Sequence, residues 1–129
     1  MSYLVDSCII IDHLRDCPHA TAFLRGATAP AISEITWIEV MVGAPDIESE
    51  APLRALLSGF RILPVDHDVA EEAVRLRRSR RLRLPDALIL ATARVHRRTL
   101  ATRNTRDFSP DDPGVAVPYR LAATSPRSA

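Results

Sequence analysis

Acidic and amide side chains follow two short apolar segments of the sequence. Asp6 comes directly after the segment 3–5, and Asn104 and Asp107 come shortly after the segment 99–102. Both segments have the length and the apolar character of buried strands. In an open parallel α/β sheet, binding and catalytic sites form beyond the carboxyl ends of the strands. The oxygen atoms of these side chains are therefore candidates for one shared site.

Glu39 and Asp86 extend this candidate set. Thr36 and Glu39 have the spacing of a capping box, which predicts a helix that begins after Thr36 and carries Glu39 in its first turn. Pro85 suits the first turn of a later helix and places Asp86 there as well. First turns of helices that follow parallel strands lie at the carboxyl edge of the sheet. We therefore expect Glu39 and Asp86 to converge with Asp6.

Such a group of carboxylates favours the binding of a hard divalent cation. Like charges repel one another and raise each other's pKa unless a positive charge lies among them. Mg²⁺ prefers oxygen ligands and is often held by one or two carboxylates together with a substrate phosphate. The histidines and cysteines of the chain lack the spacing of zinc ligands. An acidic Mg²⁺ site serves phosphodiester cleavage, in which the cation activates a water and stabilises the leaving oxygen.

Each of these acids also has a purely structural interpretation. Glu39 can serve only as the capping partner of Thr36. Asp86 can be a first-turn acid that the helix dipole favours. Asp6 and Asp107 can be turn residues at the ends of strands. The residue types alone leave these alternatives open.

The charge of the chain is unevenly distributed. All 17 basic residues are arginine, and the formal net charge is +1. Residues 71–106 hold 11 arginines against three acids, a balance of +8, whereas the rest holds 6 arginines against 13 acids, a balance of −7. A basic sector of this strength indicates a polyanionic partner such as nucleic acid. A solvated helix face or an acidic protein partner would account for it as well.

The elements that must position these residues alternate between strands and helices. Asp12 falls on the first helix, where we expect it to face solvent or an arginine, and Ser7 and Asp68 are the expected N-caps of the first and fifth helices. Alternation of this kind predicts a parallel sheet covered by helices. The expected strands are 3–5, 31–33, 61–65, 99–102 and 115–117, and the expected helices are 9–15, 19–25, 37–42, 48–57, one after Asp68, and 86–97.

Length and composition predict one globular domain. The chain has 129 residues, of which 47% are hydrophobic, and this composition is typical of a folded domain. We expect the domain to span 1–121 and a flexible tail to span 122–129. No apolar run reaches the roughly 18 residues of a membrane span. The first residues lack the features of a signal peptide, which predicts a cytoplasmic protein.

Four motifs in order resemble those of the PIN-domain ribonucleases, most closely the VapC toxins of bacterial and archaeal toxin–antitoxin pairs. They are YLVDSCIIID at 3–12, ISEIT at 32–36 followed by Glu39 and Gly43, PDALILATA at 85–93, and LATRNTRDF at 100–108. The resemblance spans residues 3–121. It implies a PIN-like three-layer sandwich, in which helices flank a central, mostly parallel sheet of four or five strands.

The resemblance also implies which residues act at the site. Asp6, Glu39 and Asp86 would bind Mg²⁺ or Mn²⁺, and together with Asp107 they would form the catalytic set. Asn104 stands where family members often have an aspartate, so it would bind a second metal only through its carbonyl or a water, beside Asp107. Ser7 supports the site by orienting the Asp6 carboxylate or a metal-bound water, as implied by the resemblance.

The implied function is that of a metal-dependent endoribonuclease toxin. Its implied partners are an RNA substrate, a second copy of the chain in a homodimer, and a VapB-type antitoxin that inserts a basic residue near the metal. No membrane partner is expected. The residues expected to grip RNA phosphates are Arg75, Arg77, Arg78, Arg80, Arg81, Arg83 and Arg103.

Two other functions are compatible with parts of the sequence. In the first, the acidic edge is inactive and the protein acts with its antitoxin as a DNA-binding regulatory complex. The neutral Asn104 favours this alternative, and the intact Asp6 and Asp86 weigh against it. The second is a phosphatase of the haloacid dehalogenase type. Such enzymes need a second aspartate two residues after the nucleophile, where this chain has Cys8.

Overall fold

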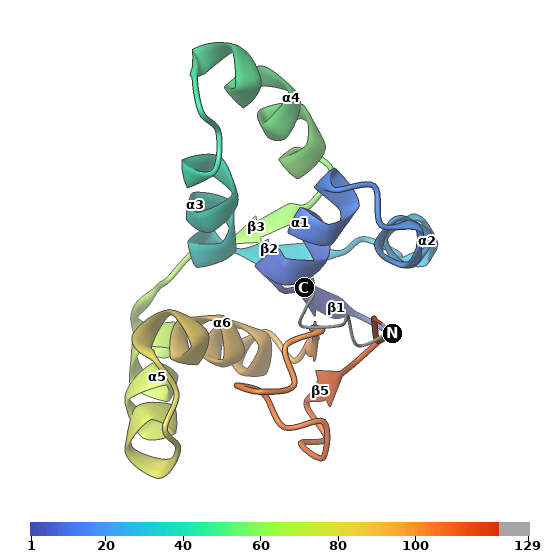
Figure 1. The fold of residues 1–129 in the computed structure, drawn as a ribbon. Coiled ribbons are helices and arrows are strands. Elements are labelled where there is room, and N and C mark those ends of the chain that lie inside the picture. Colours follow the sequence, from blue (N-terminus) through green and yellow to red (C-terminus); the bar gives the residue numbers. More distant parts are fainter. Residues whose placement is uncertain (122–129) are drawn as a thin grey trace.

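Strands and helices alternate along the chain in a computed structural model that describes residues 1–121 (Figure 1). The tail predicted for 122–129 lies outside the described residues. Within the described part, none of the helices has both the length and the apolarity of a membrane span. The elements are β1 (Tyr3–Val5), α1 (Ser7–Leu14), α2 (Pro18–Gly26), β2 (Ala31–Ser33), α3 (Glu34–Val42), α4 (Ile47–Leu57), β3 (Arg61–Leu63), α5 (His67–Ser79), α6 (Leu84–Val95), β4 (Thr99–Ala101) and β5 (Val115–Ala116).

The sheet has five parallel strands in the order β3-β2-β1-β4-β5. This arrangement confirms the predicted α/β sandwich with a parallel sheet. The chain builds outward from β1 through β2 to β3 and then returns to place β4 on the other side of β1. The strand order therefore reverses between β1 and β4, where Val5 lies opposite Ala101. Open α/β sheets bind their ligands in the crevice at such a reversal point.

Alternating side chains of the strands build two separate cores. Leu4 and Leu100 face one side of the sheet and pack with α5 and α6, whereas Val5 and Ala101 face the other side and pack with α1 to α4. This division follows from the period of two along a strand. Figure 1 shows the two helical layers on opposite sides of the sheet. Helix α6 packs against the first face and buries half of its twelve residues.

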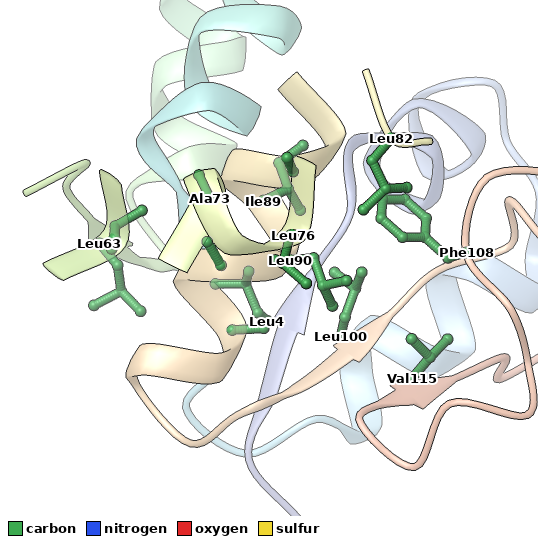
Figure 2. Close-up of a cluster of buried hydrophobic side chains, with 14 of the residues drawn as sticks. Leu4, Leu63, Ala73, Leu76, Leu82, Ile89, Leu90, Leu100, Phe108 and Val115 are labelled. Atoms are coloured by element: carbon green, nitrogen blue, oxygen red, sulfur yellow. The ribbon is translucent and has the colours of Figure 1, made fainter. Parts of the chain in front are cut away.

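Two buried side chains fix the loops that lead to the carboxyl edge. Leu82 lies just before α6 and Phe108 lies after β4, and both belong to the core beneath α5 and α6. Figure 2 shows them beside one another at one end of this core. Phe108 is only 2% exposed. Burial of these two apolar side chains holds their neighbours Arg83 and Asp107 near one another at the surface.

Two helices begin one or two residues earlier than predicted. The N-cap of α1 is Asp6 instead of Ser7, because the Asp6 carboxylate accepts a hydrogen bond from the Ser7 backbone N–H. The N-cap of α5 is Asp66 instead of Asp68, and its carboxylate accepts from the Val69 backbone N–H. Asp6 caps its helix directly after β1, whereas Asp66 does so three residues after β3 ends at Leu63.

The capping box predicted for Thr36 and Glu39 is wrong. Helix α3 begins at Glu34, directly after β2, and its N-cap is Ser33, whose hydroxyl accepts from the Ile35 backbone N–H. Thr36 lies inside the helix and is fully buried. Glu39 therefore lies beyond the first turn of α3 and does not cap the helix.

A buried carboxylate ties the loop after β4 to helix α1. Asp12 is 6% exposed and receives two hydrogen bonds from the Arg103 guanidinium, at 2.6 and 2.9 Å, and one from the Tyr119 hydroxyl at 2.7 Å. Burial alone would raise the pKa of Asp12, but these donors lower it below its usual value. Of the two predicted surroundings of Asp12, solvent or an arginine, the structure shows the arginine. This ion pair joins the two segments that carry Asp6 and Asp107.

Replacing Asp12 by alanine is expected to lower the free energy of unfolding by about 3 kcal/mol, because Arg103 loses its partner while its charge stays half-buried. Tyr119→Phe, which removes one donor, should cost about 1 kcal/mol. Urea denaturation followed by circular dichroism measures both changes. Asp111→Ala, at an exposed acid, is the control and should change stability by less than about 0.5 kcal/mol. Equal stability of Asp12→Ala and this control would show that the ion pair contributes nothing.

Candidate active site

Asp6 lies at the reversal point of the sheet and is held by donors from two segments. Its carboxylate accepts from the Ser7 backbone N–H at 2.8 Å, from the Thr102 hydroxyl at 2.7 Å and from the Cys8 thiol at 3.5 Å. Burial raises the pKa of Asp6, and the hydrogen bonds from Thr102 and Ser7 oppose this rise. The carboxylate is therefore fixed in orientation by three donors.

Thr102 is a supporting residue that the sequence did not reveal. It stands 96 positions from Asp6 and is fully buried. Its hydroxyl also accepts from the Asn104 backbone N–H at 3.0 Å. No spacing rule connects positions so far apart, and only the pairing of β1 with β4 brings them together.

Asp86 and Asp107 form the second part of the site. Burial raises the pKa of Asp86, and the negative charges of Asp107 and Asp6 raise it further. One oxygen of Asp86, Oδ2, is buried without a hydrogen-bond partner. The Arg83 guanidinium lies 3.6 Å from this oxygen and 3.6 Å from Asp107 Oδ2, so it bridges the two carboxylates.

Glu39 reaches the same region from α3. Burial raises its pKa, a hydrogen bond with the Ser7 side chain opposes this, and the charges of Asp6 and Asp86 raise it further. Ser7 thus supports the site in two ways, through its backbone N–H to Asp6 and through its side chain to Glu39. The structure therefore brings Asp6, Glu39, Asp86 and Asp107 into one electrostatically coupled group, although they come from four different segments.

Asn104 lies beside the site with its amide group already occupied. Its Nδ2 donates to Asp107 Oδ2 at 2.9 Å, and its Oδ1 accepts from the Asp107 backbone N–H at 3.3 Å. Both polar atoms of the amide therefore hold the turn that presents Asp107. The carboxylate at this end of the site is supplied by Asp107, and Asn104 orients it.

The donor set fits a divalent cation that completes its coordination with water. Within residues 1–121, no three side chains of the Asp, Glu, His or Cys type lie close enough to enclose a metal by themselves. Mg²⁺ commonly keeps several waters and takes only one or two carboxylates from the protein. The unpaired Oδ2 of Asp86 and the raised pKa values of the site acids are features that a bound cation would relieve.

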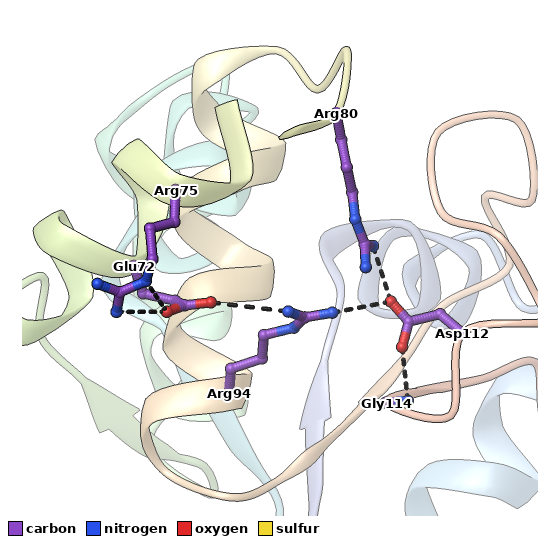
Figure 3. Close-up of polar contacts among 6 residues, drawn as sticks. All are labelled: Glu72, Arg75, Arg80, Arg94, Asp112 and Gly114. Atoms are coloured by element: carbon purple, nitrogen blue, oxygen red, sulfur yellow. Dashed lines mark hydrogen bonds and ion pairs between the residues drawn. The ribbon is translucent and has the colours of Figure 1, made fainter. Parts of the chain in front are cut away.

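Most of the arginines expected to grip RNA have partners within the protein. Figure 3 shows Arg75 on Glu72 and Arg80 on Asp112. The distances are 2.6 Å between Arg75 Nη2 and Glu72, and 2.8 Å between Arg80 Nη1 and Asp112. Arg94 joins the two pairs, because it contacts both acids. This network ties α5, α6 and the loop before β5 together.

Two further arginines of the expected set also act within the fold. Arg77 donates to the Leu82 carbonyl at 2.9 Å and thereby holds the segment before α6. Arg103 is engaged with Asp12. Arg78 and Arg81 are exposed and form no ion pair among the residues that the structure describes.

Comparison with known proteins gives consistent matches over nearly the whole chain. The family model of the PIN domain matches residues 3–109. Ribonuclease VapC10 of Mycobacterium tuberculosis is 35% identical over 133 residues, covering 97% of this chain and 98% of the relative. A solved toxin–antitoxin complex from Klebsiella pneumoniae matches at 46% identity and a TM-score of 0.86, over 92% of this chain and 99% of that one. The FitAB complex bound to an IR36 DNA fragment matches at 27% identity and a TM-score of 0.78, over 95% and 99%.

The family match covers the segment that carries all four site carboxylates. The identity to VapC10 extends over almost all of both proteins. The chain belongs to the PIN-domain family and, within it, to the VapC ribonucleases.

Proposed function

We propose that this protein is the toxin of a type II toxin–antitoxin pair. It cleaves RNA as an endoribonuclease that depends on Mg²⁺ or Mn²⁺, and a VapB-type antitoxin neutralises it. One observation carries the catalytic part of the proposal: burial raises the pKa of Asp6 and of Asp86 at the reversal point of the sheet, and the charges of Asp107 and Asp6 raise that of Asp86 further. Since its substrate is cellular RNA, the protein acts in the cytoplasm.

Asp6 and Asp86 would hold the metal, and Asp107 would hold a second ion or its waters. A bound divalent cation lowers the pKa of a water and neutralises charge on the phosphate. Glu39 takes the proton of the attacking water. The oxygen of that water forms the new bond to phosphorus as the bond between phosphorus and the leaving oxygen breaks. The raised pKa of Glu39 suits this role, because a base with a pKa nearer neutrality accepts a proton more readily.

The proposed partners follow from the relatives. VapBC-type complexes pair a PIN-domain chain with an antitoxin, and the match to the Klebsiella complex at 46% identity supports such a partner here. The proposal includes a homodimer, as expected from the resemblance. The DNA-bound FitAB complex supports a second role, in which the toxin joins its antitoxin on DNA.

Expression of the wild type in a bacterial host is expected to arrest growth and to yield a discrete RNA fragment on a gel. Asp6→Ala and Asp86→Ala should abolish both effects, because each removes a metal ligand. Cleavage by the purified variants should fall by more than about 100-fold, since even residues that only orient metal ligands cost 10- to 100-fold when replaced. Circular dichroism shows whether the variants remain folded.

Glu48→Ala, at an exposed acid in the first turn of α4, is the control and should retain cleavage. Wild-type cleavage by either site variant would refute the assignment of that residue. Normal growth and intact RNA with a folded wild type would instead favour the DNA-binding role. The neutral Asn104 would then be the first residue to test as the cause of the lost activity.

Asp86→Asn is expected to increase the free energy of unfolding at pH 7 in metal-free buffer. The folded state raises the pKa of Asp86 above its ordinary 3.8, so the folded state binds the proton more tightly. Stability therefore falls as pH rises through this raised pKa. Well below pH 3.8, residue 86 is uncharged in the wild type and in Asp86→Asn, and the difference between their free energies of unfolding should vanish. Urea denaturation in EDTA at pH 3 and pH 7 measures it, and a less stable Asp86→Asn at pH 7 would contradict the prediction.

The double variant Arg78→Gln, Arg81→Gln is expected to weaken RNA binding and to flatten its salt dependence. Each phosphate contact of single-stranded RNA contributes about 0.7 to the slope of log K against log salt, so the slope should fall by about 1.4. Filter binding in EDTA, where cleavage is blocked, measures it. Arg54→Gln, on α4 outside the basic sector, is the matched control. An unchanged slope in the double variant would mean that these arginines face solvent or another partner.

A further inference from the structure

Arg83 places a positive charge beside the acids of the site. It is the N-cap residue of α6, and its side chain is 79% exposed. Its backbone follows Leu82, which is buried in the core and whose carbonyl accepts from Arg77. The base of the side chain is therefore fixed while the guanidinium is mostly in contact with solvent. This combination differs from a surface arginine on a mobile loop.

The guanidinium lies among the site acids. Its Nε is 3.6 Å from Asp86 Oδ2, and its Nη2 is 3.6 Å from Asp107 Oδ2. Its charge also lowers the pKa of Asp86 and Glu39 against the effects of burial and mutual repulsion. Among the described residues, no other arginine forms an ion pair with these site acids.

The contacts of Arg83 are loose in comparison with those of Arg103. Arg103 grips Asp12 with two hydrogen bonds at 2.6 and 2.9 Å, and that pair is largely withdrawn from water. The two contacts of Arg83 are longer and the side chain is mostly solvated. Exposed ion pairs of this kind contribute little to stability and exchange readily. Arg103 thus has the geometry of a permanent partner and Arg83 that of a replaceable one.

We propose that Arg83 is the built-in counter-cation of the acidic site: it bridges Asp86 and Asp107 while no divalent metal is bound, and metal binding displaces it. The inference rests on the proposed metal-dependent function. Metal and guanidinium compete because both use the Asp86 carboxylate, and a second ion or the waters of the first would use Asp107 as well. The displaced guanidinium stays tethered beside the site, and its N–H donors become available to a phosphate of the RNA.

Competition makes a prediction that a purely structural role would not. Arg83→Gln should bind Mn²⁺ about three- to tenfold more tightly than the wild type, because two exposed ion pairs no longer oppose the metal. The same variant should cleave RNA more slowly at saturating Mn²⁺, because one phosphate contact is lost. Tighter Mn²⁺ binding together with slower cleavage is expected of a side chain that pairs with the acids without metal and contacts RNA phosphate when metal is bound.

The experiment titrates Mn²⁺ into the purified full chain at pH 7 and low ionic strength, with free Mn²⁺ measured by electron paramagnetic resonance. The charge-matched control is Arg97→Gln, at an exposed arginine beyond the other end of α6, which should keep wild-type Mn²⁺ affinity. Arg83→Lys retains a cation and should stay near the wild type. The difference between the wild type and Arg83→Gln should shrink at 0.5 M salt, where exposed charges are screened.

The outcomes separate this inference from the proposed function. If the wild type binds Mn²⁺ and Arg83→Gln binds it equally or more weakly, Arg83 is not a competitor and the inference is overturned, while the metal-dependent function stands. If Arg97→Gln tightens binding as much as Arg83→Gln, the effect is one of net charge and the inference is again overturned. If the wild type binds no Mn²⁺, the metal assignment and the inference fall together.

Discussion

Parallel pairing between β1 and β4 is the constraint on which the site depends. The pairs Tyr3–Thr99, Leu4–Leu100 and Val5–Ala101 align the ends of the two strands. Asp6 and Thr102 therefore emerge side by side, and the hydroxyl can hold the carboxylate. The strands that lie outside this pair, β2, β3 and β5, extend the sheet and support the two helical layers. The strand order reverses here, and an open α/β sheet forms its crevice at such a point.

Bringing the site acids together disfavours their charged forms. Burial raises the pKa of Asp6, Glu39 and Asp86, and their mutual repulsion adds to it. A fold selected for stability alone would not bring these groups together. Arg83 offsets part of the repulsion through two long contacts, with Asp86 and Asp107. The same repulsion among the acids would favour a divalent cation at this site.

The basic sector has two distinct uses that its composition does not separate. Arg77, Arg80 and Arg103 hold loops and helices in place through short contacts with carboxylates or carbonyls. Arg78 and Arg81 remain exposed on the same sector. A count of charges over residues 71–106 treats all of these arginines alike. Only the part of the charge that has no internal partner is available to attract RNA.

The sequence by itself determined the class of the fold and the set of acids. Apolar segments of strand length that alternate with helices predicted the parallel sheet, and the four motifs identified Asp6, Glu39, Asp86 and Asp107 as the candidate site. These features depend on local pattern, which is written in neighbouring residues. The helix starts were less accurate, because Asp6, Ser33 and Asp66 cap their helices earlier in the chain than the residues expected to do so.

Tertiary structure alone decided how the acids are supported. Nothing in the spacing indicates that Thr102 holds Asp6, that Arg103 belongs to Asp12, or that Asn104 uses its amide to orient Asp107. The same holds for Arg83, one arginine among many in its sector, which differs in lying beside two of the site acids, Asp86 and Asp107. Such partnerships depend on distances between segments far apart in the chain. Those distances exist only once the sheet has paired and both cores have packed.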